Sequence, residues 1–316
     1  MKRFVKHTLL FALPLLLLAY PLDRVISGLL KDSLFKRGEL EVWNDIYQGD
    51  AACDIAIYGS SRAWVHIDPI ILQDSLGISA YNFGLDGHNF WLQYLRHLEL
   101  LEHNPAPKQI LLSVDVFTLD KRKDLFNYQQ FMPYMLGNER IAHYTSSYQG
   151  YNKLDYYLPL LRYVGEQDAL RACQQAYFEP RPEIKIRNRG YRGIEREWND
   201  DLQKAKAKRD KIQAVFDPDS VELLEQFLVA CKEAGIRVDL VYTPEYIEAQ
   251  EFVSNRQMVI DHFSQLAEEH NLRFFDYSDD SLSKDRSLFY NGLHLNARGS
   301  QLFSQKLAAD LKATMD

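Results

Sequence analysis

Cysteine is scarce in this chain and follows no ligand pattern. The 316 residues contain three cysteines, Cys53, Cys173 and Cys231, which are odd in number and widely separated. This spacing matches neither a disulfide framework nor a structural zinc site. An H-E-x-x-H pattern, which places two histidine ligands on one face of a helix, is also missing. The sequence therefore predicts three small buried cysteines and no metal site.

An excess of basic residues is missing as well. The formal net charge is -7 at pH 7, and the isoelectric point is near 5.8. Because nucleic-acid-binding proteins typically carry a basic surface that neutralises phosphates, these values argue against a general nucleic-acid binder. The content of 46% hydrophobic and 13% aromatic residues excludes a mainly disordered protein. We expect a large packed core.

Long apolar runs are missing except at the start of the chain. Residues 8–22, TLLFALPLLLLAYPL, follow three basic residues within the first six positions. A basic flank before an apolar run is typical of a targeting segment, and the basic side stays in the cytoplasm. We predict an N-terminal membrane anchor or signal over residues 1–30, and we favour an uncleaved anchor because no clear cleavage site follows. A signal peptide cleaved near residues 25–27 and a buried core helix are the alternatives.

The remainder of the chain shows the alternation typical of an α/β fold. After a linker at residues 31–51, five short runs rich in Val, Ile and Tyr alternate with segments that carry apolar residues at helical spacing. Strands that alternate with helices form parallel sheets with right-handed connections. We predict one doubly wound, flavodoxin-like α/β domain over residues 52–316, with a five-stranded parallel sheet. The five predicted strands are DIAIYGS, SAYNFG, KQILLSVDVF, RVDLVYTP and LRFFDYS.

One segment interrupts this alternation. Residues 120–217 stand between the third and the fourth predicted strand, and this connection is much longer than an ordinary one in such folds. The segment is rich in tyrosine. We predict an inserted subdomain that covers or borders the edge of the sheet where ligands bind. Its tyrosines either contact a sugar polymer or serve as packing residues.

A serine and a histidine stand at two points where such a fold can form a site. Ser61 follows the first predicted strand in the segment YGSSRAW, and His294 stands in FYNGLHLNARGS, near the start of the last predicted helix. Open parallel sheets bind ligands at the carboxyl ends of their strands. A serine hydroxyl is a weak nucleophile until a neighbouring imidazole accepts its proton, so the two segments together predict a Ser-His site. Taken alone, the first segment could equally be an ordinary Gly-Ser-Ser turn, and the second could equally contain an ordinary surface histidine.

Three segments in this order resemble the SGNH (GDSL-type) hydrolases. They are GSSR after the first strand, NFGLDG after the second and LHLNARG near the C-terminus. The resemblance covers residues 52–119 and 219–316, and it is particularly to the membrane-anchored, cell-envelope branch that handles O-acylation of polysaccharides. It implies the SGNH-hydrolase fold. Because serine chemistry of this kind is free of metal, it also implies no cofactor.

The resemblance assigns an expected role to each site residue. Ser61 stands at the position of the nucleophile, and Asn291 and His294 stand at those of the acid and the base. The backbone amides of Ser61 and Gly87 would donate hydrogen bonds to the oxyanion of a tetrahedral intermediate. Arg62, next to the nucleophile, either binds an anionic or hydroxylated substrate or forms a structural salt bridge.

Two positions depart from the family pattern. The family has an aspartate that orients the histidine where this chain has Asn291, and an oxyanion-hole asparagine where this chain has Asp115. An asparagine can hold the imidazole ring but cannot stabilise an imidazolium, and an ionised carboxylate only accepts hydrogen bonds. Three accounts are open. Either Asp115 or Asp86 orients His294 instead, or Asp115 is a buried neutral acid that donates, or the site no longer hydrolyses a substrate.

These inferences define the expected function. We expect an extracytoplasmic serine esterase or O-acyltransferase that acts on envelope polysaccharide through an acyl-Ser61 intermediate, on the periplasmic or cell-surface side of a bacterial inner membrane. The alternative is a catalytically impaired scaffold that binds glycan or a membrane acyltransferase. The expected partners are acylated polysaccharide, the membrane through the N-terminal helix and a membrane-bound acyltransferase, with no nucleic acid. Ser61, Gly87 and His294 favour the enzyme, whereas Asn291 and Asp115 favour the scaffold.

Overall fold

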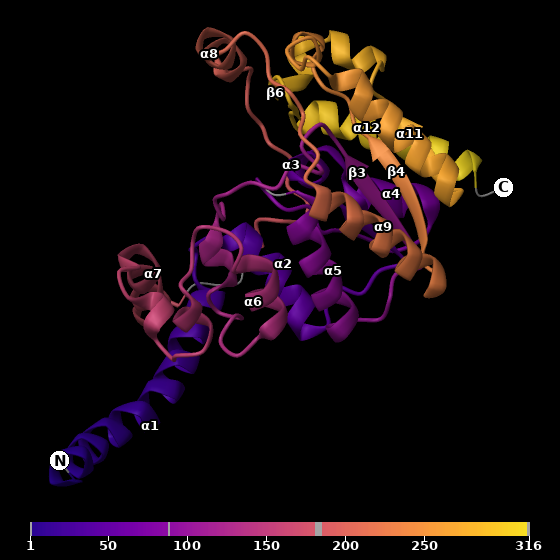
Figure 1. Cartoon of the computed structure of the whole chain (residues 1–316). Helices are drawn as coiled ribbons and strands as arrows, with labels where there is room; N and C mark the ends of the chain where they lie inside the picture. Colours follow the sequence, from indigo (N-terminus) through magenta and orange to yellow (C-terminus); the bar gives the residue numbers. More distant parts are fainter. Residues whose placement is uncertain (1, 88, 181–184, 315–316) are drawn as a thin grey trace. The chain divides into compact units, whose positions relative to one another are not determined.

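The computed structural model describes residues 2–87, 89–180 and 185–314 and contains a five-stranded parallel sheet (Figure 1). The strand order is β2-β1-β3-β4-β5, which is the flavodoxin-like order, and every neighbouring pair is parallel. The predicted α/β class and its five strands are therefore confirmed. The strands are β1 (Ile55–Tyr58), β2 (Ala80–Asn82), β3 (Gln109–Val114), β4 (Arg237–Tyr242) and β5 (Arg273–Asp276).

The sheet belongs to unit 2, which comprises residues 42–122 and 186–316. Local sequence signals explain where several of its helices begin and end. Asp68 and Asp217 cap α4 and α9, each followed by a proline at the first helical position, and Gly77 ends α4 in a left-handed conformation. The α-helices are α3 (Ser61–His66), α4 (Pro69–Leu76), α5 (Phe90–His103), α8 (Asp201–Lys208), α9 (Pro218–Glu233), α10 (Ile247–Gln250), α11 (Arg256–His270) and α12 (Ala297–Ala313). Two short 3-10 helices, η4 (Ser281–Lys284) and η5 (Arg286–Leu288), precede the antiparallel pair β6 (Phe289–Asn291) and β7 (His294–Leu295).

The core is divided between the two faces of the sheet. Ile57 of β1 packs in a cluster with Phe303 and Leu307 of α12, together with residues of α3 and α4. The next residue, Tyr58, contacts Phe227 of α9, with ring centroids 6.4 Å apart. Because successive strand residues point to opposite faces, helices cover both sides of the sheet. This burial explains why the central strands read as continuous apolar runs.

Unit 1 comprises residues 1–41 and 123–185. The guanidinium of Arg162 donates to both carboxylate oxygens of Asp23, at 2.7 and 2.8 Å, and the hydroxyls of Ser27 and Tyr163 lie 2.8 Å apart. The later part of α1 therefore packs within this unit. The elements are α1 (Lys2–Asp32), α6 (Glu139–Thr145), α7 (Gln167–Phe178), η1 (Tyr128–Phe131), η2 (Lys153–Tyr156) and η3 (Leu161–Tyr163), and α2 (Arg37–Gln48) continues from unit 1 into unit 2.

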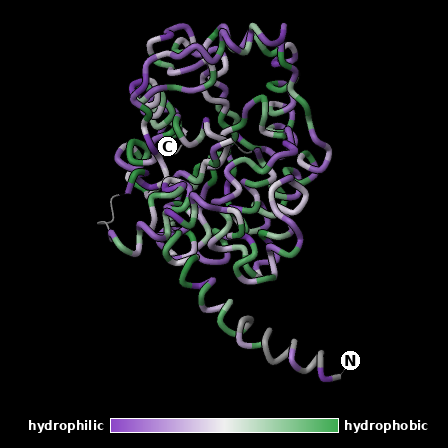
Figure 2. The backbone as a smooth tube through the Cα atoms, turned by 90° about the vertical axis from the view of Figure 1, so that its left-hand side faces the viewer, coloured by the Kyte–Doolittle hydropathy of each residue, from purple (hydrophilic) through white to green (hydrophobic). Residues whose placement is uncertain are grey.

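The structure divides the chain differently from the sequence-based domain boundaries. The segment 31–51, expected to be a linker, contains α2, and the expected insertion at 120–217 is shared between the two units. The burial of Asp23 explains part of this difference, since α1 supplies core residues that a free anchor would not. Among the described residues, no helix combines the length and the apolar character needed to span a membrane, so the expected membrane helix has no support in the structure. Figure 2 shows short hydrophobic stretches interleaved with hydrophilic ones along the chain.

Candidate active site

Ser61 stands at the carboxyl edge of the sheet. After β1 ends at Tyr58, Gly59 adopts a φ of 139° and Ser60 caps the helix α3, whose first residue is Ser61. A Cβ atom at position 59 would lie 2.6 Å from the carbonyl oxygen of Ser113 in β3. Both the positive φ and this close approach require glycine. The tight turn therefore presents Ser61 at the edge where open parallel sheets bind ligands.

His294 lies directly beside Ser61. Its Nε2 atom is 2.7 Å from the Ser61 hydroxyl, although the two residues are 233 positions apart in the chain. The histidine begins β7, which pairs with β6 just before α12. The distance is that of a good hydrogen bond and is within the reach that a general base needs.

Asn291 determines the tautomer of His294. Its Oδ1 atom lies 3.0 Å from the backbone nitrogens of Leu293 and His294 and 3.0 Å from His294 Nδ1. Because backbone N–H groups only donate, the atom that they meet must be the side-chain oxygen. Nδ1 then carries the ring hydrogen and donates it to Asn291, and Nε2 is left as the acceptor that faces Ser61. The asparagine therefore holds the tautomer that proton transfer from the serine requires.

The surroundings of His294 keep its ring neutral. Burial, followed by the positive charge of Arg62, lowers the pKa of His294 from 6.5 to about 3. The ring of Tyr290 lies parallel to the imidazole, with centroids 5.3 Å apart and an interplanar angle of 4°. A neutral imidazole can accept the serine proton at any physiological pH. The same surroundings disfavour the imidazolium that results, so His294 is a weak base.

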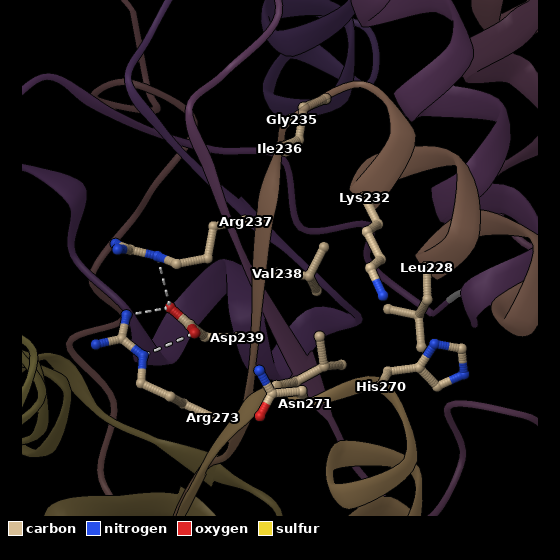
Figure 3. A pocket seen from close by; sticks show the side chains of 11 residues that line it. Leu228, Lys232, Gly235, Ile236, Arg237, Val238, Asp239, His270, Asn271 and Arg273 are labelled. Atoms are coloured by element: carbon tan, nitrogen blue, oxygen red, sulfur yellow. Dashed lines mark hydrogen bonds and ion pairs between the residues drawn. The ribbon is translucent and has the colours of Figure 1, made fainter.

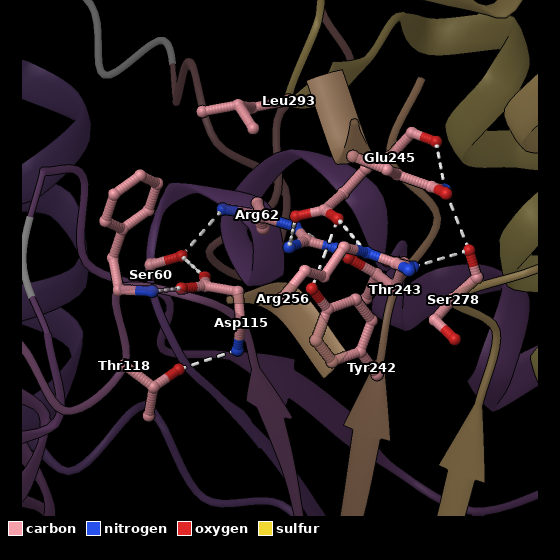
Figure 4. A network of polar contacts seen from close by, with 12 residues as sticks. Ser60, Arg62, Asp115, Thr118, Tyr242, Thr243, Glu245, Arg256, Ser278 and Leu293 are labelled. Carbon is pink, nitrogen blue, oxygen red and sulfur yellow. Dashed lines mark hydrogen bonds and ion pairs between the residues drawn. The ribbon is translucent and has the colours of Figure 1, made fainter. Parts of the chain in front are cut away.

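Arg62 forms a buried salt bridge instead of facing a substrate (Figure 4). The residue is 3% exposed. Its Nη1 atom donates to Glu245 at 2.5 Å, Nε donates to the Thr243 hydroxyl at 3.1 Å, and Nη2 donates to the Thr243 carbonyl oxygen. A guanidinium engaged in this way is not available to a ligand. The substrate-binding role expected for Arg62 is therefore not supported, and the salt bridge that was the other expectation is observed.

Asp115 acts as a cap at the end of β3. One carboxylate oxygen accepts the Ser60 hydroxyl at 2.6 Å, and the other accepts the backbone N–H of Phe117 at 2.7 Å. The Asp115 amide donates to the Thr118 hydroxyl at 2.7 Å. A carboxylate that accepts hydrogen bonds on both oxygens is not an oxyanion donor, so this geometry does not support the expected contribution of position 115 to the oxyanion hole. The partner of His294 Nδ1 is the amide of residue 291, and neither Asp115 nor Asp86 takes that place.

The loop after β2 contains Gly87, the other residue expected to contribute a backbone amide to the oxyanion hole. Gly87 has a φ of 72°, a left-handed conformation that favours glycine, and it precedes residue 88, which lies outside the described residues. Asn82, at the end of β2, was not recognised from the sequence. Its side chain donates to the carbonyl oxygens of Ala63 and Ile67 at 2.7 and 2.8 Å and accepts the amide of Gly84 at 2.9 Å. Asn82 therefore ties this loop to the helix that begins with Ser61.

Two further residues were missed at the end of β4. Thr243 and Glu245 are fully or almost fully buried and hold Arg62, and Glu245 also accepts hydrogen bonds from Tyr242 and Arg256 at 3.1 and 3.4 Å. The available signal was the polar segment TPEY directly after an apolar strand. Strand ends of this kind meet at the ligand edge of a parallel sheet.

A separate pocket of about 530 Å³ lies at the opposite edge of the sheet (Figure 3). Its lining comes from the ends of α9 and α11 and the beginnings of β4 and β5. Asp239 in its wall is paired with Arg273 at 2.6 Å and with Arg237 at 3.6 Å. This pocket is therefore distinct from the Ser61 site. In the part of the chain that the structure describes, no group of three or more acidic, histidine or cysteine side chains could hold a metal ion.

The chain was compared with known proteins, and only the comparison with solved structures found similar ones. No family model matches the chain, and no curated protein matches its sequence significantly. Among solved structures, a protein from Desulfitobacterium hafniense DCB-2 described as a lipolytic protein of the G-D-S-L family aligns at 10% identity and a TM-score of 0.40, covering 81% of this chain and 98% of that one. A protein from Streptococcus pneumonia described as a platelet activating factor aligns at 15% identity and a TM-score of 0.44, covering 90% and 94%. A GDSL-like lipase from Bacteroides thetaiotaomicron VPI-5482 aligns at 12% identity and a TM-score of 0.33, covering 82% and 88%. Identities and scores of this size do not assign a function, so the function must be inferred from the site itself.

Proposed function

We propose that this protein is a serine esterase or O-acyltransferase of the SGNH type that works through an acyl-Ser61 intermediate. The observation that carries the proposal is the hydrogen-bonded series from Ser61 through His294 to Asn291, with distances of 2.7 and 3.0 Å. A nucleophile, a base and a residue that orients the base stand in the order that activates a serine.

The first half of the reaction transfers the acyl group to the enzyme. His294 Nε2 accepts the hydroxyl proton as Ser61 Oγ attacks the ester carbonyl carbon, and the carbonyl oxygen becomes an oxyanion. The Ser61 amide at the start of α3 and the Gly87 amide are the proposed donors to this oxyanion. When the tetrahedral intermediate collapses, the carbon–oxygen bond to the alcohol breaks, and His294 returns the proton to the leaving alkoxide.

The second half regenerates the enzyme. A water molecule or an acceptor hydroxyl gives its proton to His294 Nε2 and attacks the acyl-Ser61 carbonyl carbon. The bond to Ser61 Oγ then breaks, and His294 returns the proton to the serine. Attack by water makes the protein an esterase, and attack by a sugar hydroxyl makes it a transferase.

The test is covalent labelling by a fluorophosphonate, which reacts with activated serines. We expect Ser61→Ala to abolish labelling and turnover of p-nitrophenyl acetate, and His294→Ala to be nearly as damaging, because such groups act as a unit. Ser60→Ala is the matched control. It removes the helix cap and the partner of Asp115, so it should lower stability by about 1 kcal/mol but retain labelling.

Failure of folded wild-type protein to label, over a range of pH and ester chain length, would contradict this proposal. The alternative would then be the scaffold that binds a glycan or a membrane acyltransferase without catalysis. Labelling at Ser60 in place of Ser61 would contradict the assignment of the nucleophile.

For the substrate we propose an O-acyl ester of an envelope polysaccharide, encountered outside the cytoplasm. This part of the proposal is supported by the sequence resemblance and by the basic residues that precede the apolar run at residues 8–22. Release of acetate from acetylated polysaccharide, lost in Ser61→Ala, is the expected result. Full-length protein should also stay with membranes after an alkaline wash, and its complete release would contradict the proposed location.

A further inference from the structure

A second histidine, His66, lies beside the proposed catalytic pair. It is the last residue of α3, five positions after Ser61, and it is fully buried. The rings of His66 and His294 meet edge to face, with centroids 6.1 Å apart and an interplanar angle of 86°. Its position beside His294 was not predicted from the sequence.

Both ring nitrogens of His66 have protein partners. Nε2 lies 3.0 Å from the backbone nitrogen of Leu295, and Nδ1 lies 2.8 Å from the Thr243 hydroxyl. Because the Leu295 N–H can only donate, Nε2 must be an unprotonated acceptor, and Nδ1 must carry the ring hydrogen. Burial and the neighbouring Arg62 hold the pKa of His66 well below its usual value, which agrees with a ring that stays neutral.

The contacts of His66 join the elements that carry the site. Through Leu295 its ring holds β7, whose first residue is His294, and through Thr243 it holds the end of β4. Its backbone carbonyl accepts the hydroxyls of Ser300 and Ser304 in α12, at 3.1 and 3.2 Å. His66, at the end of α3, thus contacts the last helix α12, the residue that follows β4 in the central sheet, and β7, which contains His294.

We propose that His66 is a positioning residue that sets the Ser61–His294 distance, a role that rests on the proposed function. As a neutral imidazole it accepts the Leu295 amide hydrogen and so holds His294 against the helix that carries Ser61. It takes no part in proton transfer, because both of its nitrogens are occupied by protein groups. The Leu295 N–H is buried in this arrangement, and it would lose its acceptor if His66 were replaced by an apolar residue.

The test compares full-length wild-type protein with His66→Phe and His66→Gln. Phenylalanine fills the space but removes the acceptor, whereas glutamine can place an amide oxygen near the position of Nε2. For p-nitrophenyl acetate we expect His66→Phe to lower kcat by about 100-fold with little change in KM, since misplacement by about 1 Å costs that much. His66→Gln should recover activity to within about tenfold of wild type.

His97→Phe is the matched control, since His97 is also a buried histidine, hydrogen-bonded to Tyr58 at 2.9 Å and located on α5. Its activity should stay near that of wild type. Thermal unfolding of all variants distinguishes a loss of the fold from a displacement of His294 in a folded protein.

Nitrogen-15 NMR of labelled histidines gives a readout that does not depend on turnover. In wild type, His66 and His294 should each carry the ring hydrogen on Nδ1. In His66→Phe, Asn291 still holds that tautomer of His294, but the Nε2 signal of His294 should shift because its hydrogen bond with Ser61 is lengthened or lost. A wild-type His66 with its hydrogen on Nε2 would overturn the proposal even if the phenylalanine variant did not fold, and so would a folded His66→Phe with wild-type kcat and an unchanged His294 Nε2 signal. If wild type neither labels nor hydrolyses esters, the proposed function fails, while the NMR result still decides the role of His66.

Discussion

Replacing Asn291 by aspartate tests how the missing carboxylate limits the site. In the structure, Asn291 Oδ1 accepts hydrogen bonds from two backbone N–H groups and from His294 Nδ1, each at 3.0 Å. An aspartate oxygen can accept the same three bonds, so Asn291→Asp changes the charge and leaves the tautomer of His294 unchanged. The substitution therefore isolates the stabilisation of the imidazolium from the orientation of the ring.

The size of the effect follows from the pKa of His294. Burial and Arg62 lower this pKa to about 3, and an adjacent negative charge raises the pKa of a histidine by about 1 to 3 pH units. Each unit corresponds to about 1.4 kcal/mol of imidazolium stabilisation. If the full imidazolium charge develops in the transition state, kcat/KM at pH 8 rises by about tenfold for a shift of one pH unit and by about 1000-fold for a shift of three. These increases are upper limits, because a partly developed charge is stabilised less.

The assay is the pH dependence of kcat/KM for p-nitrophenyl acetate. With a His294 pKa near 3, the wild-type rate should not fall between pH 8 and pH 5, because the base remains neutral over that range. In Asn291→Asp the histidine binds its proton more tightly, so the acid limb should move to higher pH while the plateau rises. Asn296→Asp is a matched control, because Asn296 caps α12 through its own side-chain oxygen and a charge there keeps that cap.

Two results would refute this reasoning. A rate in Asn291→Asp equal to wild type, with no movement of the acid limb, would mean that the carboxylate does not act on His294. A loss of activity in Asn291→Asp comparable to that in Asn291→Ala would mean that the neutral amide is itself required.

Three further predictions concern stability. Gly59→Ala should destabilise the protein by more than about 2 kcal/mol, because the added Cβ would meet a backbone carbonyl of β3. Gly77 has a φ of 70° but open space around it, so Gly77→Ala should destabilise the protein by only about 1 kcal/mol. Equal losses of stability in urea unfolding would contradict the proposed clash at position 59. Burial lowers the pKa of His97 in the folded protein to about 4, whereas in the unfolded chain it is near 6.5. As the pH falls below 6.5, the unfolded chain therefore takes up a proton at His97 first, and the free energy of unfolding should be about 1.4 kcal/mol smaller at pH 5.5 than at pH 8 because of this residue. The same pH dependence of stability in His97→Phe would show that this histidine contributes nothing. Arg162→Met leaves the Asp23 carboxylate buried without its cation and should destabilise unit 1 by about 3 to 5 kcal/mol, measured as faster proteolysis of α1 and α7, and unchanged resistance would contradict this.

The sequence was sufficient for the strands and for the two ends of the proposed catalytic pair. All five strands were readable because they are short and bounded by turn residues. The parallel sheet buries nearly every residue of β1 to β4, which therefore contain apolar runs, whereas β5 at the edge of the sheet is only half-buried and was recognisable by its two phenylalanines. Ser61 and His294 stood out because each follows a local pattern at an expected point of the fold. The helix caps Asp68 and Asp217 were equally local.

The sequence by itself determined the order of elements and pointed to Ser61 and His294 as the candidate nucleophile and base, since both inferences depend on neighbours within a few positions. It could not decide whether Arg62 faces a ligand or Glu245, because those residues are 183 positions apart and meet only when β1 and β4 are aligned by the sheet. The group that orients His294 is a different case. Asn291 lies only three positions before His294, and its oxygen accepts from two nearby backbone amides and the ring in a local turn. Only the tertiary structure shows that this amide, and not the carboxylate of Asp86 or Asp115, is the partner of Nδ1. The physical reason is that hydrogen bonds are directional and short in range, so the choice among partners that are distant in the sequence depends on the packing of the whole unit.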